Sequence, residues 1–377
     1  MTKELEIYLH IPFCLRKCQY CDFLSFAGEE SRYQDYRKAL EAEAENCLLP
    51  LGSYQVSTVF FGGGTPSLLP GREIGDILAV LRRRFPFRPD AEITLEANPG
   101  TVTGEKLRAY RQAGVNRLSF GCQSTDNREL KDLGRIHSYE DFLRTWHLAC
   151  EAGFTNRNVD LMSGLPGQTV ASWERSLRQV AELGPEHISA YSLILEEGTP
   201  FYQKRETLNL PGEEEERLMY ERTHEILEEY GYCQYEISNY AKPGRACRHN
   251  LGYWTGREYL GLGLGASSLL GHSRYRNTDD FSFYLEHSAD TAAIRQETER
   301  LSLEDQQAEY MILGLRLMAG VSVEEFERRF GRRLHQVYGS VIEKYKQLGL
   351  LEEEEGMIRL TRRGISLSNT VMADFLP

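Results

Sequence analysis

Short hydrophobic runs alternate with longer amphipathic runs over the first two hundred residues of the chain. The short runs predict strands at 6–11, 57–63, 92–98, 116–123, 157–164 and 187–193. The longer runs have helical periodicity and predict helices near 32–48, 71–84, 104–113, 139–152 and 170–183. A repeated order of strand and helix is typical of a parallel sheet with crossover helices. The pattern therefore predicts an α/β fold.

Residues that can carry chemistry follow the ends of these predicted strands. They are Cys14 to Cys21, Gly62 to Thr65, Glu96, Gln123 and Asp160. In parallel α/β folds, ligands bind at the carboxyl ends of the strands. An open barrel of six strands brings all these positions to one rim. We therefore expect a partial (βα)6 barrel over residues 1–205.

The rhythm changes after about residue 205. The run "GEEEERLMYERTHEILEEYG" predicts one acidic helix, and the glycine-rich "REYLGLGLGASSLLG" follows it. From about residue 300 the pattern predicts three helices and a hairpin that turns at Glu355 and Gly356, which resembles a winged helix. We divide the chain into a barrel (1–205), a barrel extension (206–298) and a helical, winged-helix-like C-terminal domain (299–377). The acidic hairpin argues against DNA binding by that domain.

Composition and charge narrow the class of protein. The chain has 377 residues, of which 41% are hydrophobic and 27% are charged, as in ordinary globular proteins. The net charge of −12 argues against a nucleic-acid partner, because phosphates attract basic surfaces. No apolar run approaches the length of a membrane span, and the first residues lack the features of a secretory signal. We expect a cytoplasmic protein, in which the eight cysteines are thiols or metal ligands.

Three of the cysteines, Cys14, Cys18 and Cys21, stand in the spacing C-x3-C-x2-C. A structural zinc site normally needs four ligands, and the nearest further cysteine, Cys47, lies in a predicted helix. Three thiolates on a cubane of four irons leave one iron without a protein ligand, and that iron can hold a small molecule. The pattern favours a [4Fe-4S] cluster, with zinc or a purely structural cluster as alternatives.

The same spacing resembles the signature of the radical S-adenosylmethionine (SAM) superfamily. The resemblance implies that SAM chelates the open iron through its amino and carboxylate groups and that Tyr20 lies against the adenine. Within the superfamily, the resemblance is to the oxygen-independent coproporphyrinogen III oxidase family. It rests on six runs: "YLHIPFC", "GGGTPS", "EANP", "SFGCQS", "LGRIHS" and "DLMSGLPGQT". The SAM contacts that this resemblance implies are Tyr8, Tyr20, Gly63, Gly64, Thr65, Glu96, Gln123, Arg135 and Asp160.

Elementary chemistry agrees with several of these assignments. Glycines let the backbone approach a ligand closely. The carboxylates of Glu96 and Asp160 can bind ribose hydroxyls or an ammonium group, and Arg135 can bind a carboxylate through two hydrogen bonds. Two features depart from the decarboxylating oxidases. Phe23 stands where they carry a further cysteine, and Cys14 comes after a shorter leading segment than theirs.

A further motif lies at 247–254, in "CRHNLGYW". It resembles the heme-binding H-N-x-x-Y-W signature of the heme chaperones in this family. A neutral imidazole is a good axial ligand for heme iron, and aromatic rings can stack on a porphyrin. The resemblance implies heme ligation by His249 with Tyr253 and Trp254 beside it, and Cys247 is a possible second ligand. Because the motif lies outside the six βα units, we expect separate sites for heme and SAM.

The resemblance implies a protein that binds a [4Fe-4S] cluster, SAM and heme and delivers heme to acceptor hemoproteins. Respiratory-chain proteins are examples of such acceptors, and an acceptor can be associated with a membrane. Flavodoxin or ferredoxin would be suitable electron donors. We assign no catalytic residue. The alternative is a radical SAM enzyme of tetrapyrroles, either an oxygen-independent coproporphyrinogen III oxidase or a heme ring-opening enzyme.

Overall fold

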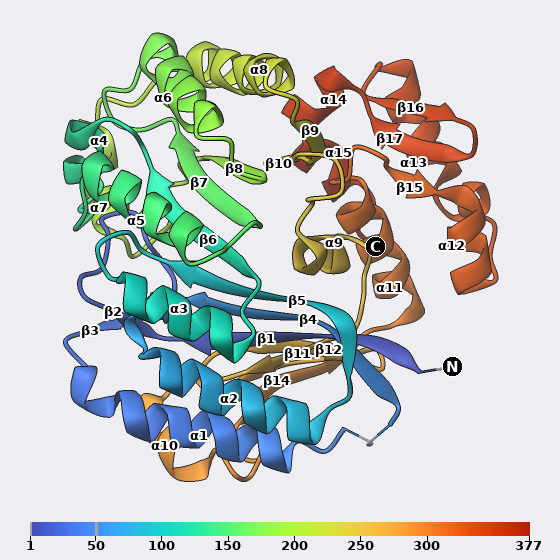
Figure 1. Cartoon of the computed structure of the whole chain (residues 1–377). Coiled ribbons are helices and arrows are strands. Elements are labelled where there is room, and N and C mark those ends of the chain that lie inside the picture. Colours follow the sequence, from blue (N-terminus) through green and yellow to red (C-terminus); the bar gives the residue numbers. More distant parts are fainter. Residues whose placement is uncertain (1, 50–51) are drawn as a thin grey trace.

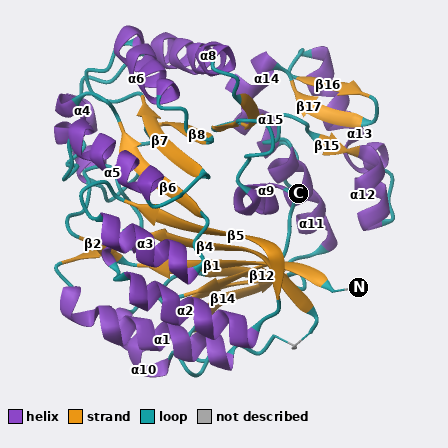
Figure 2. Cartoon of the chain, in the orientation of Figure 1, coloured by secondary structure: helices purple, strands orange, loops and turns teal. Residues whose placement is uncertain are grey.

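The protein is described by a computed structural model that covers residues 2–49 and 52–377. Its centre is a twelve-stranded sheet in the order β14-β13-β12-β11-β1-β4-β5-β6-β7-β8-β10-β9 (Figures 1 and 2). The six strands predicted from the sequence are its middle, and all five neighbouring pairs among them are parallel. They are β1 (Lys3–Ile11), β4 (Tyr54–Gly63), β5 (Phe87–Ala97), β6 (Arg117–Gln123), β7 (Arg157–Ser163) and β8 (His187–Ser192).

The predicted crossover helices are confirmed to within two residues at either end. They are α1 (Tyr33–Asn46), α2 (Gly71–Arg84), α3 (Gly104–Ala113), α5 (Tyr139–Glu151) and α6 (Val170–Glu182). Ser138 and Thr169 start α5 and α6 with capping boxes, in which the hydroxyl accepts a backbone hydrogen bond and the third helical residue bonds back. Figure 1 shows these helices on the outer side of the curved sheet. Together they form the open α/β barrel that the sequence predicts.

The segment after the barrel adds strands to both edges of the sheet. β11 (Tyr259–Leu262) pairs parallel with β1, and β12 (Ser267–Leu270), β13 (Ser273–Asn277) and β14 (Arg295–Arg300) continue antiparallel. On the other edge β10 (Asn239–Ala241) pairs with β8, and β9 (Cys233–Glu236) pairs with β10. The helices of this segment are α8 (Glu213–Glu229), α9 (Arg248–Trp254) and α10 (Phe281–His287), and two short helices of the barrel itself are α4 (Asn127–Asp132) and α7 (Pro200–Gln203). Two short strands, β2 (Phe13–Cys14) and β3 (Phe26–Ala27), pair beside the cysteines.

The last part of the chain has its own hydrophobic core, with Phe326, Ile358 and Phe375 fully buried. Three strands form a small antiparallel sheet in the order β15-β17-β16, and the turn of its hairpin lies at Glu355 and Gly356 as predicted. Its elements are α11 (Leu303–Gly314), β15 (Val321–Ser322), α12 (Val323–Phe330), α13 (Leu334–Gln347), β16 (Leu351–Glu354), β17 (Met357–Leu360), α14 (Arg362–Ser366) and α15 (Ser368–Ala373). This arrangement confirms the winged-helix-like architecture. The domain boundaries at 205 and 298 stay predictions.

Candidate functional site

The inner face of the barrel surrounds a cavity of about 670 Å³. Alternate residues of the strands line it, because successive side chains of a strand point to opposite faces. On β6, for example, Arg117, Ser119 and Gly121 face the cavity, while Leu118 and Phe120 are fully buried under the outer helices. Other strands contribute Tyr8, His10, Phe60, Glu96, Asn158, Asp160, Met162, Ser189 and Tyr191. The cavity is therefore polar on the inside of an apolar shell.

The three cysteines of the predicted cluster lie at one end of this cavity. Cys14, Cys18 and Cys21 all line it, and all three are partly exposed free thiols. The sulfur of Cys14 lies 3.6 Å from Oγ1 of Thr65, and Nη1 of Arg135 donates to the sulfur of Cys18 at 3.5 Å. The loop after β2 thus presents three sulfurs to one space, next to a hydroxyl and a guanidinium.

This donor set suits a cluster better than a single ion. Among residues 2–49 and 52–377, no three Cys, His, Asp or Glu side chains gather closely enough for one metal ion. A cubane binds each thiolate through a different iron and so takes thiolates that are further apart. Burial and the sulfurs of Cys18 and Cys14 raise the pKa of Cys21 to about 11, so a cation would be needed to hold the thiolate form.

The glycine segment after β4 forms a close backbone cradle beside the cysteines. Gly63 has φ +107°, and a Cβ there would lie 2.5 Å from the His10 ring. A Cβ on Gly64 would lie 2.6 Å from the carbonyl oxygen of Phe13, and the Gly64 N–H donates to Ile11 at 2.9 Å. Only glycine fits either position without displacing these neighbours. Gly63, Gly64 and Thr65 all line the cavity, as expected for residues that contact a ligand.

Two carboxyl groups at strand ends share the cavity. Burial and the nearby Asp160 raise the pKa of Glu96 to about 8. Asp160 accepts hydrogen bonds from Asn158 at 2.7 Å and Ser119 at 3.3 Å, but its burial still raises its pKa. Burial thus favours the protonated forms of both groups, and a ligand that donates hydrogen bonds or carries positive charge would favour their ionised forms.

Gln123 and Arg135 are held by local backbone geometry. Gln123 has φ 70°, an unusual value for a residue other than glycine, and it lies at an irregularity where β6 pairs with β7. Nη2 of Arg135 donates to the carbonyl oxygen of Gly121 at 2.7 Å, while its buried Nε has no partner among the described residues. Such an unpaired donor is costly unless a ligand accepts from it. Tyr8 and Tyr20 complete the predicted set, and both line the cavity.

The heme-motif residues lie on α9, which contacts β4 on the inner side of the sheet (Figure 1). His249 is 1% exposed and stacks on Phe60 with 5.0 Å between ring centroids. Its Nδ1 lies 2.6 Å from Oγ1 of Thr58, and its Nε2 lies 3.1 Å from the Tyr253 hydroxyl. Burial and the charge of Arg117 lower the pKa of His249 to about 3, so the imidazole is neutral.

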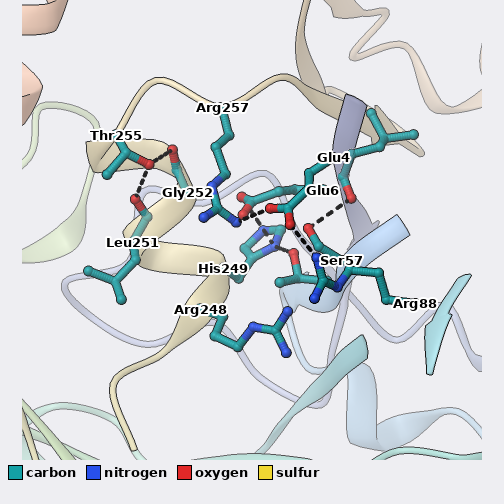
Figure 3. Close-up of polar contacts among 12 residues, drawn as sticks. Glu4, Glu6, Ser57, Arg88, Arg248, His249, Leu251, Gly252, Thr255 and Arg257 are labelled. Atoms are coloured by element: carbon teal, nitrogen blue, oxygen red, sulfur yellow. Dashed lines mark hydrogen bonds and ion pairs between the residues drawn. The ribbon is translucent and has the colours of Figure 1, made fainter. Parts of the chain in front are cut away.

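Glu6 of β1 lies beside His249 (Figure 3). Its carboxyl group is fully buried, and neither oxygen has a partner among the described residues. Oε2 lies 3.8 Å from Nδ1 of His249, but this is no ion pair, because burial raises the pKa of Glu6 to about 9. A Cβ on Gly252 would lie 1.8 Å from Oε1 of Glu6, so this glycine lets α9 approach the sheet.

The heme motif lies inside the barrel cavity, although it follows the six βα units in the chain, and the prediction of separate sites for heme and SAM stays a prediction. His249 and Tyr253 line the same cavity as the three cysteines and the strand-end residues. Sequence order does not reveal this position, because α9 follows the barrel in the chain but folds back into it. Trp254 points elsewhere, with its ring under the guanidinium of Arg316 at 4.3 Å. Cys247 is fully buried, with its sulfur 3.6 Å from Oε1 of Glu92.

Several cavity residues were not found from the sequence. His10 packs against Gly63, with Nε2 2.8 Å from the carbonyl oxygen of Leu24. Tyr191, which reads as ordinary packing, lines the cavity together with Arg117. The alternation of polar and apolar residues in "RLSFGCQ" was the available signal, since it places every second residue of β6 on the inner face.

Comparisons with known proteins place this site in a family. The model of the radical SAM superfamily matches residues 8–180, and the model of the HemN C-terminal domain matches residues 301–367. The heme chaperone HemW of Bacillus subtilis is 38% identical over 98% of both chains. The chain belongs to the HemW family of radical SAM proteins. The heme chaperone HemW of Lactococcus lactis is 35% identical over 100% of this chain and 98% of that relative. The heme chaperone HemW of Escherichia coli is 44% identical over 70% of this chain and 69% of that relative.

A solved structure confirms the fold. Coproporphyrinogen III oxidase (HemN) from Escherichia coli, a radical SAM enzyme, matches with a TM-score of 0.87 at 24% sequence identity, over 99% of this chain and 90% of that one. At this identity the likeness concerns the architecture alone. Membership of the superfamily implies a [4Fe-4S] cluster and SAM, and the HemW relatives are heme chaperones by name. In the described part of the chain, no helix is long and apolar enough to cross a bilayer.

Proposed function

We propose that this HemW-family protein is a heme chaperone that holds a [4Fe-4S] cluster and SAM at one end of the barrel cavity and heme near α9. The single observation that carries the proposal is the neutral, buried His249 in a cavity that also contains three free thiols. Its cargo would pass to acceptor hemoproteins, for which respiratory-chain proteins and membrane-associated acceptors remain candidates. Flavodoxin or ferredoxin would reduce the cluster.

Cys14, Cys18 and Cys21 would hold the cluster. Arg135, with its unpaired Nε, offers a hydrogen bond to an anionic group of SAM beside Cys18. Glu96, Asp160 and the Gly63–Thr65 cradle offer acceptors and backbone groups to the rest of that ligand. When bound, the cluster and SAM supply one-electron reductive chemistry, and this chain's residues position the ligand and keep water out.

For heme, Nε2 is the nitrogen available to the iron. Nδ1 is held by Thr58 deep in the sheet, whereas Nε2 contacts only the hydroxyl of Tyr253, one turn away on the same short helix. Binding then requires Tyr253 to move from Nε2 and leave that position to the iron. A hydrogen bond to the other ring nitrogen is the usual way in which a ligating histidine is oriented.

Hemin titration of the anaerobically reconstituted protein tests the proposal. A Soret band typical of ligated iron should form at about one heme per chain, and His249→Ala should lose or shift it while retaining iron and sulfide. His187→Ala is the matched control, since His187 is also buried and bonded, to Asn158 and the Tyr235 hydroxyl. Replacing Cys14, Cys18 and Cys21 together by alanine should remove the cluster and leave heme binding. An unaltered spectrum in His249→Ala would contradict the ligand assignment.

The shared cavity favours one second candidate. Because His249 and the cysteines line one space, a tetrapyrrole bound there would lie near the cluster, as substrate of a radical SAM enzyme would. Phe23, which is 60% exposed, replaces the cysteine expected of a decarboxylating oxidase. Incubation of the native protein with coproporphyrinogen III, SAM and dithionite separates the two functions. Rapid decarboxylation would favour the enzyme, and stable heme binding without conversion would favour the chaperone.

A further inference from the structure

Arg117 is a buried guanidinium whose Nε has no hydrogen-bond partner among residues 2–49 and 52–377. It begins β6, is 2% exposed and lines the cavity. The guanidinium also forms no ion pair with any residue in 2–49 or 52–377. A buried cation normally has a carboxylate in direct contact, because removal from water costs several kcal/mol. Arg117 therefore has unused capacity to bind an anion.

The charge of Arg117 is nevertheless secure. Burial lowers its pKa, but nearby acidic groups, the carboxyls of Glu92 and Asp160 among them, outweigh that effect and the pKa is raised. These groups act from a distance and leave the donors free. Thr94 of the neighbouring strand β5 pairs with Arg117, and its buried hydroxyl also lacks a hydrogen-bond partner among the described residues. Two adjacent inner-face positions thus carry unsatisfied donors.

Strand register places Arg117 in the layer of the cavity that contacts α9. Tyr8 pairs with Phe60, Phe60 with Thr94 and Thr94 with Arg117, so these four residues lie in one row across the sheet. Phe60 is the residue on which His249 stacks. The other end of β6, at Gln123, lies six residues on, or about 20 Å at a strand's rise of roughly 3.3 Å per residue. A group bound to Arg117 therefore lies near His249, at the end of β6 that is remote from Gln123.

We infer that the Arg117 guanidinium binds a carboxylate of the ligand beside α9, namely a propionate of the tetrapyrrole whose iron is ligated by His249. Guanidinium and carboxylate form two parallel charge-assisted hydrogen bonds, which fix orientation as well as position. Iron at His249 and propionate at Arg117 would hold the macrocycle at two points. The inference rests on the proposed function and names the contact that recognises its ligand.

The test compares hemin with its dimethyl ester, in which both propionates are neutral. Native protein should bind the ester about 10- to 100-fold more weakly, as expected for the loss of a charge-assisted pair. Arg117→Met should bind hemin with the ester's affinity and lose the preference between the two ligands. Arg117→Lys should recover part of that preference. Both variants should keep the native iron content, sulfide content and affinity for SAM, which would show that the barrel is intact.

Arg157→Met is the matched control, because Arg157 begins the next strand, is paired with Glu186 and lies over Trp146. It should keep the native preference for hemin. If Arg117→Met kept that preference, the inference would be wrong while heme binding stood. Weaker SAM binding in Arg117→Met with unchanged hemin binding would assign the carboxylate to SAM and also overturn it. If the native protein bound no hemin at all, the proposed function would fail first.

Discussion

At the scale of single residues, the buried carboxyl groups fall into two kinds: those that face the cavity and can bind a ligand, and those that affect only the stability of the fold. Glu96 and Asp160 face the cavity, whereas Glu43 of α1 is buried behind the added strands. Glu43 accepts hydrogen bonds from the Gly263 N–H at 2.8 Å, the Tyr284 hydroxyl at 2.6 Å and the Asn277 amide at 2.6 Å. Even so, burial raises its pKa from 4.5 to about 7.

This shift predicts that stability falls as pH rises. Between pH 4.5 and 7 the folded protein holds a proton on Glu43 that the unfolded chain has released, so the free energy of unfolding decreases with pH over that range. The loss is at most roughly 3 kcal/mol, at 1.36 kcal/mol per pKa unit. Urea denaturation of the native protein and Glu43→Gln at pH 5 and pH 8 measures it, and the variant should show the smaller difference.

Glu41→Gln controls for the loss of one carboxylate from the same helix, since Glu41 pairs with Arg37 near the surface. An equal pH difference in the native protein and Glu43→Gln would refute the assignment to Glu43.

Residue roles divide into those visible in the sequence and those that need the fold. The cysteines and the Gly63–Thr65 segment were predictable because ligand spacing and glycine are local signals. Arg117 and Glu6 were not, because a single charge in a strand reads as exposed until the opposite face is known. Both lie close to His249 of α9, which is more than a hundred positions away in the sequence.

At the scale of elements, α9 connects the cavity with the rest of the protein. One side of this helix carries His249 into the barrel, and it also packs against α11 of the C-terminal domain. The fit depends on Gly252, which faces Glu6 (Figure 3). The periodicity of "CRHNLGYW" could not predict this position, because a run of eight residues has no clear apolar face.

Gly252→Ala should therefore displace α9. Alanine favours a helix by about 1 kcal/mol over glycine, but its Cβ would lie 1.8 Å from Oε1, 2.1 Å from Cδ and 2.2 Å from Oε2 of the fully buried Glu6, so the carboxyl group or the helix would have to move. We expect a net loss of about 1–3 kcal/mol in the free energy of unfolding, typical of an overpacked core, and weaker hemin binding. Chemical denaturation and the hemin titration measure the two effects.

Gly75→Ala on α2 is the matched control. The new Cβ would lie 3.6 Å from the Cβ of Ala113, which is an ordinary van der Waals contact. This variant should therefore be as stable as the native protein or more stable. If both variants gained stability, α9 would have more freedom than the packing of Gly252 on Glu6 indicates.

At the scale of the whole molecule, the barrel was predictable and the connections between its parts were not. Six regular βα units repeat, and each crossover helix has the expected apolar stripe, so pattern alone identifies them. The strands on both edges are short, and two of them, β9 and β10, have four and three residues. Elements of this length carry little periodicity, and the pairing of β10 with β8 joins residues that are remote in sequence.

Arg316 joins the C-terminal domain to the barrel. Its Nη2 lies 3.3 Å from Oε2 of Glu236, which is fully buried, and its guanidinium covers the ring of Trp254. The backbone on either side of it adds hydrogen bonds, from Ile237 N–H to Arg316 at 3.1 Å and from Met318 N–H to Tyr235 at 3.0 Å. Arg316, two residues after the end of α11, thus contacts both the added strand β9 and the heme-motif helix α9.

We predict that Arg316→Met loosens the attachment of the C-terminal domain. The change leaves Glu236 without its cation, and breaking a buried ion pair costs up to roughly 3–5 kcal/mol. Because the Arg316 side chain is 26% exposed, we expect about 2 kcal/mol. Calorimetry should show the core of residues 301–377 melting before the barrel, whereas the native protein should melt in one step.

Lys344→Met is the control, because it removes an exposed partner of Asp374 within the same core. It should change the stability of that core by less than about 1 kcal/mol. If Arg316→Met melted like Lys344→Met, the backbone hydrogen bonds would hold the two parts together without the ion pair.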